Sequence, residues 1–148
     1  MEDRDEELII PVSENRVRST FMEDFRNFIR SQVPPDRIAF DWKDPENDAR
    51  GHYPVDCRVN GTIRPLFIYA LPSDSKVKDA TISLLTFERW GLDCRSLGIF
   101  EEQETINRHV LARFTDVCEK TFSSLAGETT RRIDTHLRRL MAAGGKSG

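Results

Sequence analysis

Cysteine is scarce in this sequence of 148 residues. Cys57, Cys94 and Cys118 are far apart, and no two of them form a Cys-x-x-Cys pair. The pattern indicates neither a zinc site nor a disulfide framework, so reduced thiols in a cytoplasmic protein are the simplest interpretation. No apolar run approaches the roughly 20 residues that span a bilayer. The acidic start of the chain also lacks the apolar stretch of a signal peptide. We predict a cytoplasmic protein with no membrane partner.

Motifs for cofactor, metal or nucleophile chemistry are missing as well. His52, His109 and His136 are scattered, with no cysteine or aspartate at the spacing of metal ligands. No serine lies in a nucleophile elbow, and no glycine-rich loop joins a strand to a helix in the manner of a phosphate-binding loop. We therefore predict no cofactor and no metal site, with Mg²⁺ required only by the nuclease alternative below.

The chain does have the composition of a globular domain with a highly charged surface. Its hydrophobic content is 38% and its charged content 32%. The net charge of −3 argues against general nucleic-acid binding, although not against a local basic face. The chain begins acidic and ends basic. We predict an α/β core over residues 1–126 with an acidic lead-in, followed over 127–148 by a basic helix and a flexible tail.

Hydrophobic spacing and turn residues predict the secondary structure. The lead-in over residues 1–10 ends in three apolar residues and is predicted as either an edge strand or a docking tail. The predicted helices cover residues 13–32, 75–90, 103–123 and 129–141, the predicted strands 38–42, 53–59, 62–71 and 93–100, and the predicted polar loop 43–51.

The most informative segment is a predicted β-hairpin at residues 53–71. Its first arm alternates in polarity, and Asn60-Gly61 is the strongest short signal for a two-residue type I′ turn. This register would place Asp56 opposite Pro65. Residues 65–71 are nearly continuously apolar, which is typical of a central strand. A helix separates this strand from residues 93–100, so we predict that the two run parallel. The element order is α-β-β-β-α-β-α plus a basic helix, which predicts an α/β (α+β) fold with a mixed sheet.

This order resembles the restriction-endonuclease-like core of the PD-(D/E)xK superfamily. More closely, the chain is similar to an uncharacterised bacterial and phage domain family of mobile-element proteins. The segments that carry the resemblance are 55–61, 65–71, 78–85 and 111–116. It implies a setting in a phage, a mobile element or a bacterial defence system.

Active members of the superfamily need one acid on the first hairpin arm and an acid-x-Lys set on the next strand. The two carboxylates hold a divalent cation, while the lysine orients the attacking water and stabilises charge on the phosphate. Asp56 fits the first position, but residues 66–71 carry no charge. Substitutes from elsewhere are Glu88 as the acid and Lys76 or Lys78 as the base. Asp56 has a second interpretation, as a hairpin residue paired with Arg58 or Arg64.

The basic C-terminal helix has three interpretations. It is a solvated outer face, a partner or dimer helix laid in a groove, or a contact for nucleic-acid phosphates. No aromatic residue lies among its arginines to stack on bases. The predicted contact residues are Arg131, Arg132, Leu137, Arg138 and Arg139.

Three functional hypotheses follow. The first is a non-catalytic nuclease-fold protein that binds a protein partner, for which a second copy of the chain is one candidate. The second is a metal-dependent nuclease with migrated catalytic residues. The third is a module that binds nucleic acid without cleaving it.

Overall fold

The computed structural model describes the backbone of residues 20–147 and the side chains of residues 20–143. Its centre is a five-stranded sheet in the order β1-β2-β3-β4-β5. β1 (Ile38–Trp42), β2 (Val55–Val59) and β3 (Leu66–Leu71) pair antiparallel, whereas β3, β4 (Arg95–Phe100) and β5 (Lys120–Phe122) pair parallel. The predicted mixed α/β class is confirmed, as is the parallel pairing of residues 65–71 with 93–100. The predicted lead-in and residues 13–19 of the first predicted helix lie outside the described residues.

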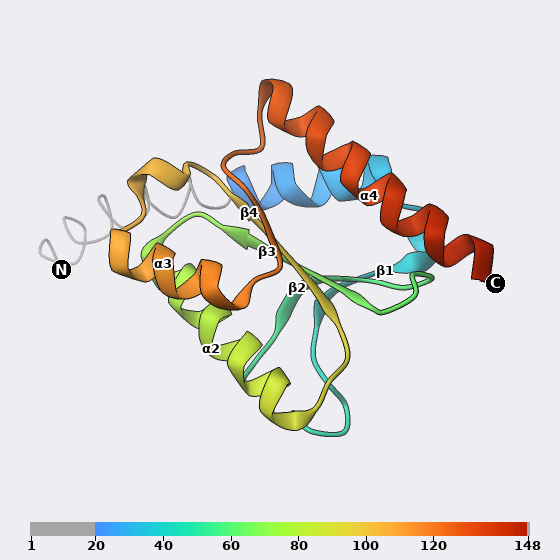
Figure 1. The fold of residues 1–148 in the computed structure, drawn as a ribbon, viewed down its shortest axis with the longest axis horizontal. Helices are drawn as coiled ribbons and strands as arrows, with labels where there is room; N and C mark the ends of the chain where they lie inside the picture. The colour runs from blue at the N-terminus through green and yellow to red at the C-terminus, as the bar shows by residue number, and fades with distance from the viewer. Residues whose placement is uncertain (1–19, 148) are drawn as a thin grey trace, which may run out of the picture.

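Helices cover both faces of this sheet (Figure 1). The first helix, described over residues 20–32, and α4 (Gly127–Ser147) lie on one face. α2 (Asp74–Trp90) and α3 (Arg108–Val117) lie on the other. Two separate clusters of buried side chains result, one on each side of the sheet. The cluster under α4 includes Phe25, Ile29, Ile133 and Leu137, all with no exposed surface. α4 is therefore part of the domain core rather than an appendage to it.

α2 begins and ends where local chemistry predicts. The Ser73 hydroxyl accepts a hydrogen bond from the Lys76 amide at 3.3 Å, and Gly91 ends the helix with a left-handed φ of 76°. The residues that follow helical spacing in this predicted helix are Val77, Ala80, Thr81, Leu84, Leu85 and Glu88. Val77, Ala80 and Leu84 are buried, whereas Leu85 and Glu88 are exposed. Ser83 and Phe87 are buried in their place, so the buried stripe lies slightly further around the helix than predicted.

The predicted register of the hairpin is wrong. Cys57 pairs with Ile68 and Val59 with Leu66, which leaves a longer connection than two residues. A type I′ turn needs positive φ at both central residues, yet among the described residues only Asp41, apart from glycines, has positive φ. The Arg37 guanidinium instead donates to the carbonyl oxygens of Asn60 and Gly61, at 2.9 and 2.8 Å. Continuing this register places Asp56 opposite Tyr69 instead of Pro65.

The predicted helix at 103–123 is also wrong in its second half. A short 3₁₀ turn at Gln103–Thr105 precedes α3, which ends at Val117, and the chain then forms β5. Ile106, Val110 and Phe114 are buried as expected, together with Cys118. Phe122, by contrast, packs on the opposite face of the sheet, under α4. β5 thereby becomes an edge strand that lies beside α4.

Two further segments are more ordered than predicted. The loop over residues 43–51 was expected to be a solvated polar loop, but Asp44 and Asp48 are buried within it. The Asp48 carboxylate accepts hydrogen bonds from the amides of His52 and Tyr53 at 2.7 and 2.8 Å. Residues 144–147, predicted as part of a flexible end, continue α4; Gly148 lies outside the described residues.

Candidate anion-binding site

The structure brings together two of the four residues proposed for catalysis. Asp56 lies on β2, facing α2, and its side chain is only 10% exposed. One carboxylate oxygen accepts a hydrogen bond from the Ala70 amide at 2.8 Å, and the other pairs with Lys76 Nζ at 2.7 Å. Asp56 therefore does not pair with Arg58 or Arg64. Both of its oxygens are already occupied by groups that link β2 to β3 and to the first turn of α2.

The other two proposed catalytic residues lie elsewhere. Glu88 is exposed near the far end of α2, and the twelve residues that separate it from Lys76 correspond to about 18 Å along the helix. Lys78 is exposed beside a groove between α2 and α3, next to Ile82 and Arg113. In the part of the chain that the structure describes, no group of three or more His, Cys, Asp or Glu residues could hold a metal ion. The positions beside Asp56 on β3 are filled by buried core residues.

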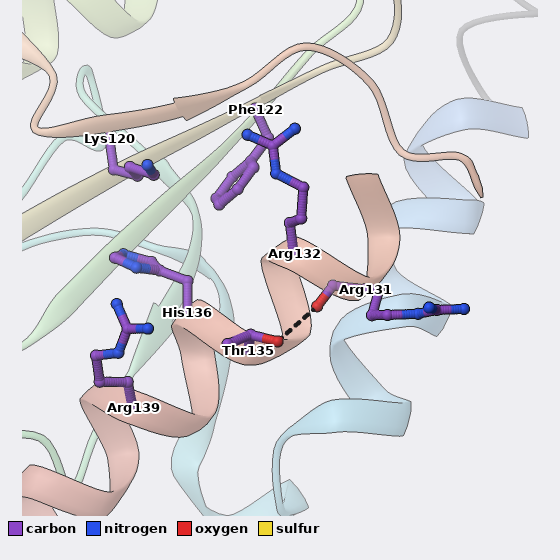
Figure 2. Close-up of a pocket in the computed structure, with 7 residues that line it drawn as sticks. All are labelled: Lys120, Phe122, Arg131, Arg132, Thr135, His136 and Arg139. Carbon is purple, nitrogen blue, oxygen red and sulfur yellow. Dashed lines mark hydrogen bonds between the residues drawn. The ribbon is translucent and has the colours of Figure 1, made fainter. Parts of the chain in front are cut away.

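A cavity of about 300 Å³ lies between β5 and α4, and positively charged side chains dominate its lining. We call it the cationic cavity (Figure 2). Its lining residues are Lys120, Phe122, Arg131, Arg132, Thr135, His136 and Arg139.

The position of these residues follows from how β5 and α4 pack. β5 pairs parallel with β4, and alternation along the strand puts Lys120 and Phe122 on the same face, towards α4. Phe122 is 4% exposed, and Lys120 Nζ lies 5.4 Å from the centre of its ring. On α4, the apolar stripe of Ile133, Leu137 and Leu140 is buried against the sheet. A neighbouring stripe of the same helix, Arg132, His136 and Arg139, follows helical spacing and faces β5.

The side chains that line the cavity do not all point into it. In Figure 2, Lys120, His136 and Arg139 converge on the same space, and Arg132 extends towards Phe122. Arg131 points away from them and forms an exposed ion pair with Glu128 at 3.5 Å. The Thr135 hydroxyl is used within α4, where it donates to the carbonyl oxygen of Arg131 at 3.0 Å. Lys120, Arg132 and Arg139 are therefore the cations available to a ligand.

These cations have no local counter-charge within the described residues. No carboxylate there lies within ion-pairing distance of Lys120, Arg132 or Arg139. The lowered pKa of His136 is consistent with this excess of positive charge. Burial lowers this pKa, and the positive charges of Lys120, Arg95 and Arg139 lower it further, opposed only by Glu119. A concave site with uncompensated positive charge is suited to bind an anion.

The cavity contains part of the contact surface predicted from the sequence. Arg131, Arg132 and Arg139 line it, whereas Arg138 lies outside it and pairs with Asp134 at 2.9 Å. Leu137 is fully buried, so its prediction as a contact residue is corrected to a core residue. Sequence reasoning missed Lys120 and His136. The spacing of His136 with Arg132 and Arg139 was a usable signal, but Lys120 was hidden inside a predicted helix.

The three thiols are not nucleophile candidates. Burial, with the charge of Asp56, raises the pKa of Cys57 to about 12. Burial is also the main cause that raises the pKa values of Cys94 and Cys118, both to about 11. All three are therefore neutral near pH 7, and Cys57, which has no exposed surface, packs as a small apolar residue.

No protein-family model, curated protein or solved structure matches the chain. The resemblance to the restriction-endonuclease-like core therefore stays a prediction. Among residues 20–147, none of the helices combines the length and apolar character that crossing a membrane requires.

Proposed function

We propose that this domain binds nucleic acid through its phosphate groups, without cleaving it, and that the cationic cavity is the contact site. The observation that carries the proposal is that Lys120, Arg132 and Arg139 line one cavity and have no carboxylate partner among the described residues. Guanidinium groups bind phosphate oxygens in pairs, which makes arginine a preferred phosphate ligand. The stripe from Arg132 to Arg139 extends about 10 Å along α4, long enough to contact more than one phosphate.

The composition of the cavity indicates contacts to phosphates rather than to bases. Its one large aromatic ring, Phe122, is buried and lies next to Lys120 Nζ, so it offers no open face for stacking. Phosphate contacts position a protein on nucleic acid but read little sequence. We therefore expect binding with weak sequence preference.

Two observations bear on the competing hypotheses. The apolar stripe of α4 is buried in the core, which argues against α4 as a dimer helix that docks by that stripe. The engagement of both Asp56 oxygens by Lys76 and Ala70 supports binding without cleavage, because a metal ion would have to displace the lysine. The setting in a phage, a mobile element or a defence system stays a prediction.

The salt dependence of binding tests the proposal. If about three phosphates are contacted, the affinity for a labelled oligonucleotide should fall about 40-fold between 50 and 200 mM salt. Arg132→Ala should weaken binding and reduce the slope of log affinity against log salt by about 1. The measurement is fluorescence anisotropy with single strands and duplexes of two unrelated sequences.

Arg138→Ala is the matched control. Arg138 is on the same helix and is similarly exposed, but it pairs with Asp134 and does not line the cavity. For Arg138→Ala, the slope of log affinity against log salt should equal that of the parent chain. An affinity that does not change with salt concentration would rule out the cationic cavity as the contact site. An equal loss of affinity in Arg132→Ala and Arg138→Ala would do the same.

Binding should also depend on pH through His136. Its pKa lies below the usual value in the free protein because of burial and of Lys120, Arg95 and Arg139. A bound phosphodiester adds negative charge beside the ring and raises that pKa, so binding takes up a proton. Affinity should then rise roughly three- to tenfold as the pH falls from 8 to 5.

A 5′-hydroxyl oligonucleotide suits this pH measurement because its phosphodiesters do not titrate in that range. His136→Gln should flatten the pH profile. His109→Gln, an exposed replacement in α3 on the opposite face of the sheet, should leave the profile unchanged. A profile equally steep in the His136 variant would mean that another group is responsible.

A further inference from the structure

We infer that the cationic cavity seats a terminal phosphate monoester, the phosphorylated end of a nucleic-acid strand, in preference to an internal phosphodiester. This inference rests on the proposed function and names the chemical group for which the site is built. Three features of the described residues carry it: the shape of the cavity, the charge inside it, and the neutralisation of the charges around it.

The shape is that of a recess between two elements rather than a groove along one. Lys120 approaches from β5 and Arg139 from α4, and the two meet beside His136, whereas Arg132 lies further along α4, towards Phe122 (Figure 2). At about 300 Å³, the cavity is at the small end of ligand pockets. An internal phosphodiester must enter with chain leaving in two directions. A terminal phosphate has one attachment and presents three oxygens to converging donors.

The charge inside the cavity also fits a monoester better. A phosphate monoester carries about −1.5 to −2 charges near pH 7, against −1 for a phosphodiester. Lys120, Arg132 and Arg139 supply positive charge that no carboxylate offsets in the described part of the chain. The group with the larger charge and the additional acceptor oxygen therefore gains more from Lys120 and Arg139, which converge beside His136.

The residues around the cationic cavity do not extend its positive surface. Arg95 pairs with Glu119 at 2.6 Å, Arg131 with Glu128 at 3.5 Å, and Arg138 with Asp134 at 2.9 Å. The net charge of the chain is −3. Proteins that track along a strand use an extended positive groove. Here the arginines next to the recess are paired with carboxylates, which favours recognition of an end over tracking along a strand.

The test compares oligonucleotides that differ only at their ends. One sequence is prepared with a 5′-phosphate, with a 3′-phosphate, or with hydroxyls at both ends, and its affinity for the full chain is measured by anisotropy. We expect at least one phosphorylated form to bind about tenfold more tightly than the hydroxyl form. Arg139→Ala and Lys120→Ala should abolish this difference. Arg131→Ala, which removes a lining residue that points away and pairs with Glu128, should retain it.

The substituted side chains are exposed, so the variants should fold, and thermal unfolding of each variant checks this. Equal affinity for phosphorylated and hydroxyl ends would overturn the inference and leave the proposed function standing. A preference for phosphorylated ends that persists in both Lys120→Ala and Arg139→Ala would overturn the inference as well, because the end would then be held elsewhere.

Two competitors, inorganic phosphate and a nucleoside 5′-monophosphate, separate the sources of the phosphate group. If they compete only at concentrations far above that of the phosphorylated oligonucleotide, the strand end is the ligand, as we expect. If they bind the cavity while no oligonucleotide binds, the proposed function is overturned, and with it the assignment of the strand end.

Discussion

Leu137→Ala is expected to lower the free energy of unfolding by about 2–5 kcal/mol. Leu137 has no exposed surface and packs in the cluster between α4 and the sheet. Its replacement removes buried apolar contacts and leaves a cavity that the rigid sheet beneath cannot fill. Urea unfolding followed by tryptophan fluorescence measures the change, since Trp42 and Trp90 are both partly buried. The result would show that the apolar stripe of α4 is used inside the domain.

The neighbouring substitution Arg138→Ala is the control, because this side chain is 72% exposed and makes one surface ion pair. It should change stability by no more than about 0.5 kcal/mol. If Leu137→Ala left stability intact and instead reduced self-association in light scattering, Leu137 would be a contact residue after all. For the same reason, removal of α4 is a poor test of dimerisation: it would expose the core.

Asp56→Ala is expected to destabilise the fold by about 1–3 kcal/mol. The substitution leaves the Ala70 amide without its acceptor and Lys76 without its carboxylate, in a site where Asp56 is 10% exposed. Asp56→Asn should recover part of the loss, because an amide oxygen can still accept from Ala70. Urea unfolding again provides the measurement.

The direction in which Asp56→Ala changes the free energy of unfolding distinguishes a structural role of Asp56 from a catalytic one. Active-site residues are often held at a cost to stability, so their removal tends to stabilise the fold. A more stable Asp56→Ala protein that loses Mg²⁺- or Mn²⁺-dependent cleavage present in the parent chain would restore the nuclease hypothesis. Asp93→Ala, which breaks an exposed pair with Arg64, should cost less than about 1 kcal/mol and calibrates the assay.

Elements with a long, regular apolar pattern were predictable. The apolar β3 and the extent of α2 were predicted from local spacing and turn residues, and both are confirmed. A basic helix was also predicted where α4 lies, but Leu137 was assigned to a contact surface and is in fact part of the core. The segment 120–122 shows that prediction from local apolar spacing can fail. Its Lys-Thr-Phe sequence continues the apolar spacing of α3, and only pairing with β4 makes it a strand. Tertiary pairing overrides local propensity in short edge strands.

The hairpin register failed for a similar reason. The Asn60-Gly61 signal is local, whereas the carbonyl oxygens of both residues are held by Arg37, which is distant in sequence. Part of the candidate site was predictable from the sequence. The arginines of α4 lie on one helix and could be placed on a common face, but their division into inward and outward groups depends on Glu128, Asp134 and β5. Lys120 joins the site only because β5 lies beside α4.

Burial of the three thiols has a practical consequence. Their pKa values of about 12, 11 and 11 leave almost no thiolate near neutral pH, so alkylating dyes should modify them slowly. A cysteine introduced at Leu85, which is 48% exposed on α2, would ionise near the ordinary value of about 8.5. Its thiolate fraction would exceed those of Cys94 and Cys118 by roughly 300-fold and that of Cys57 by roughly 3,000-fold. A single fluorophore can thus be attached on the face of the sheet opposite the cationic cavity, and its anisotropy would report the binding of a long oligonucleotide without a label on the nucleic acid.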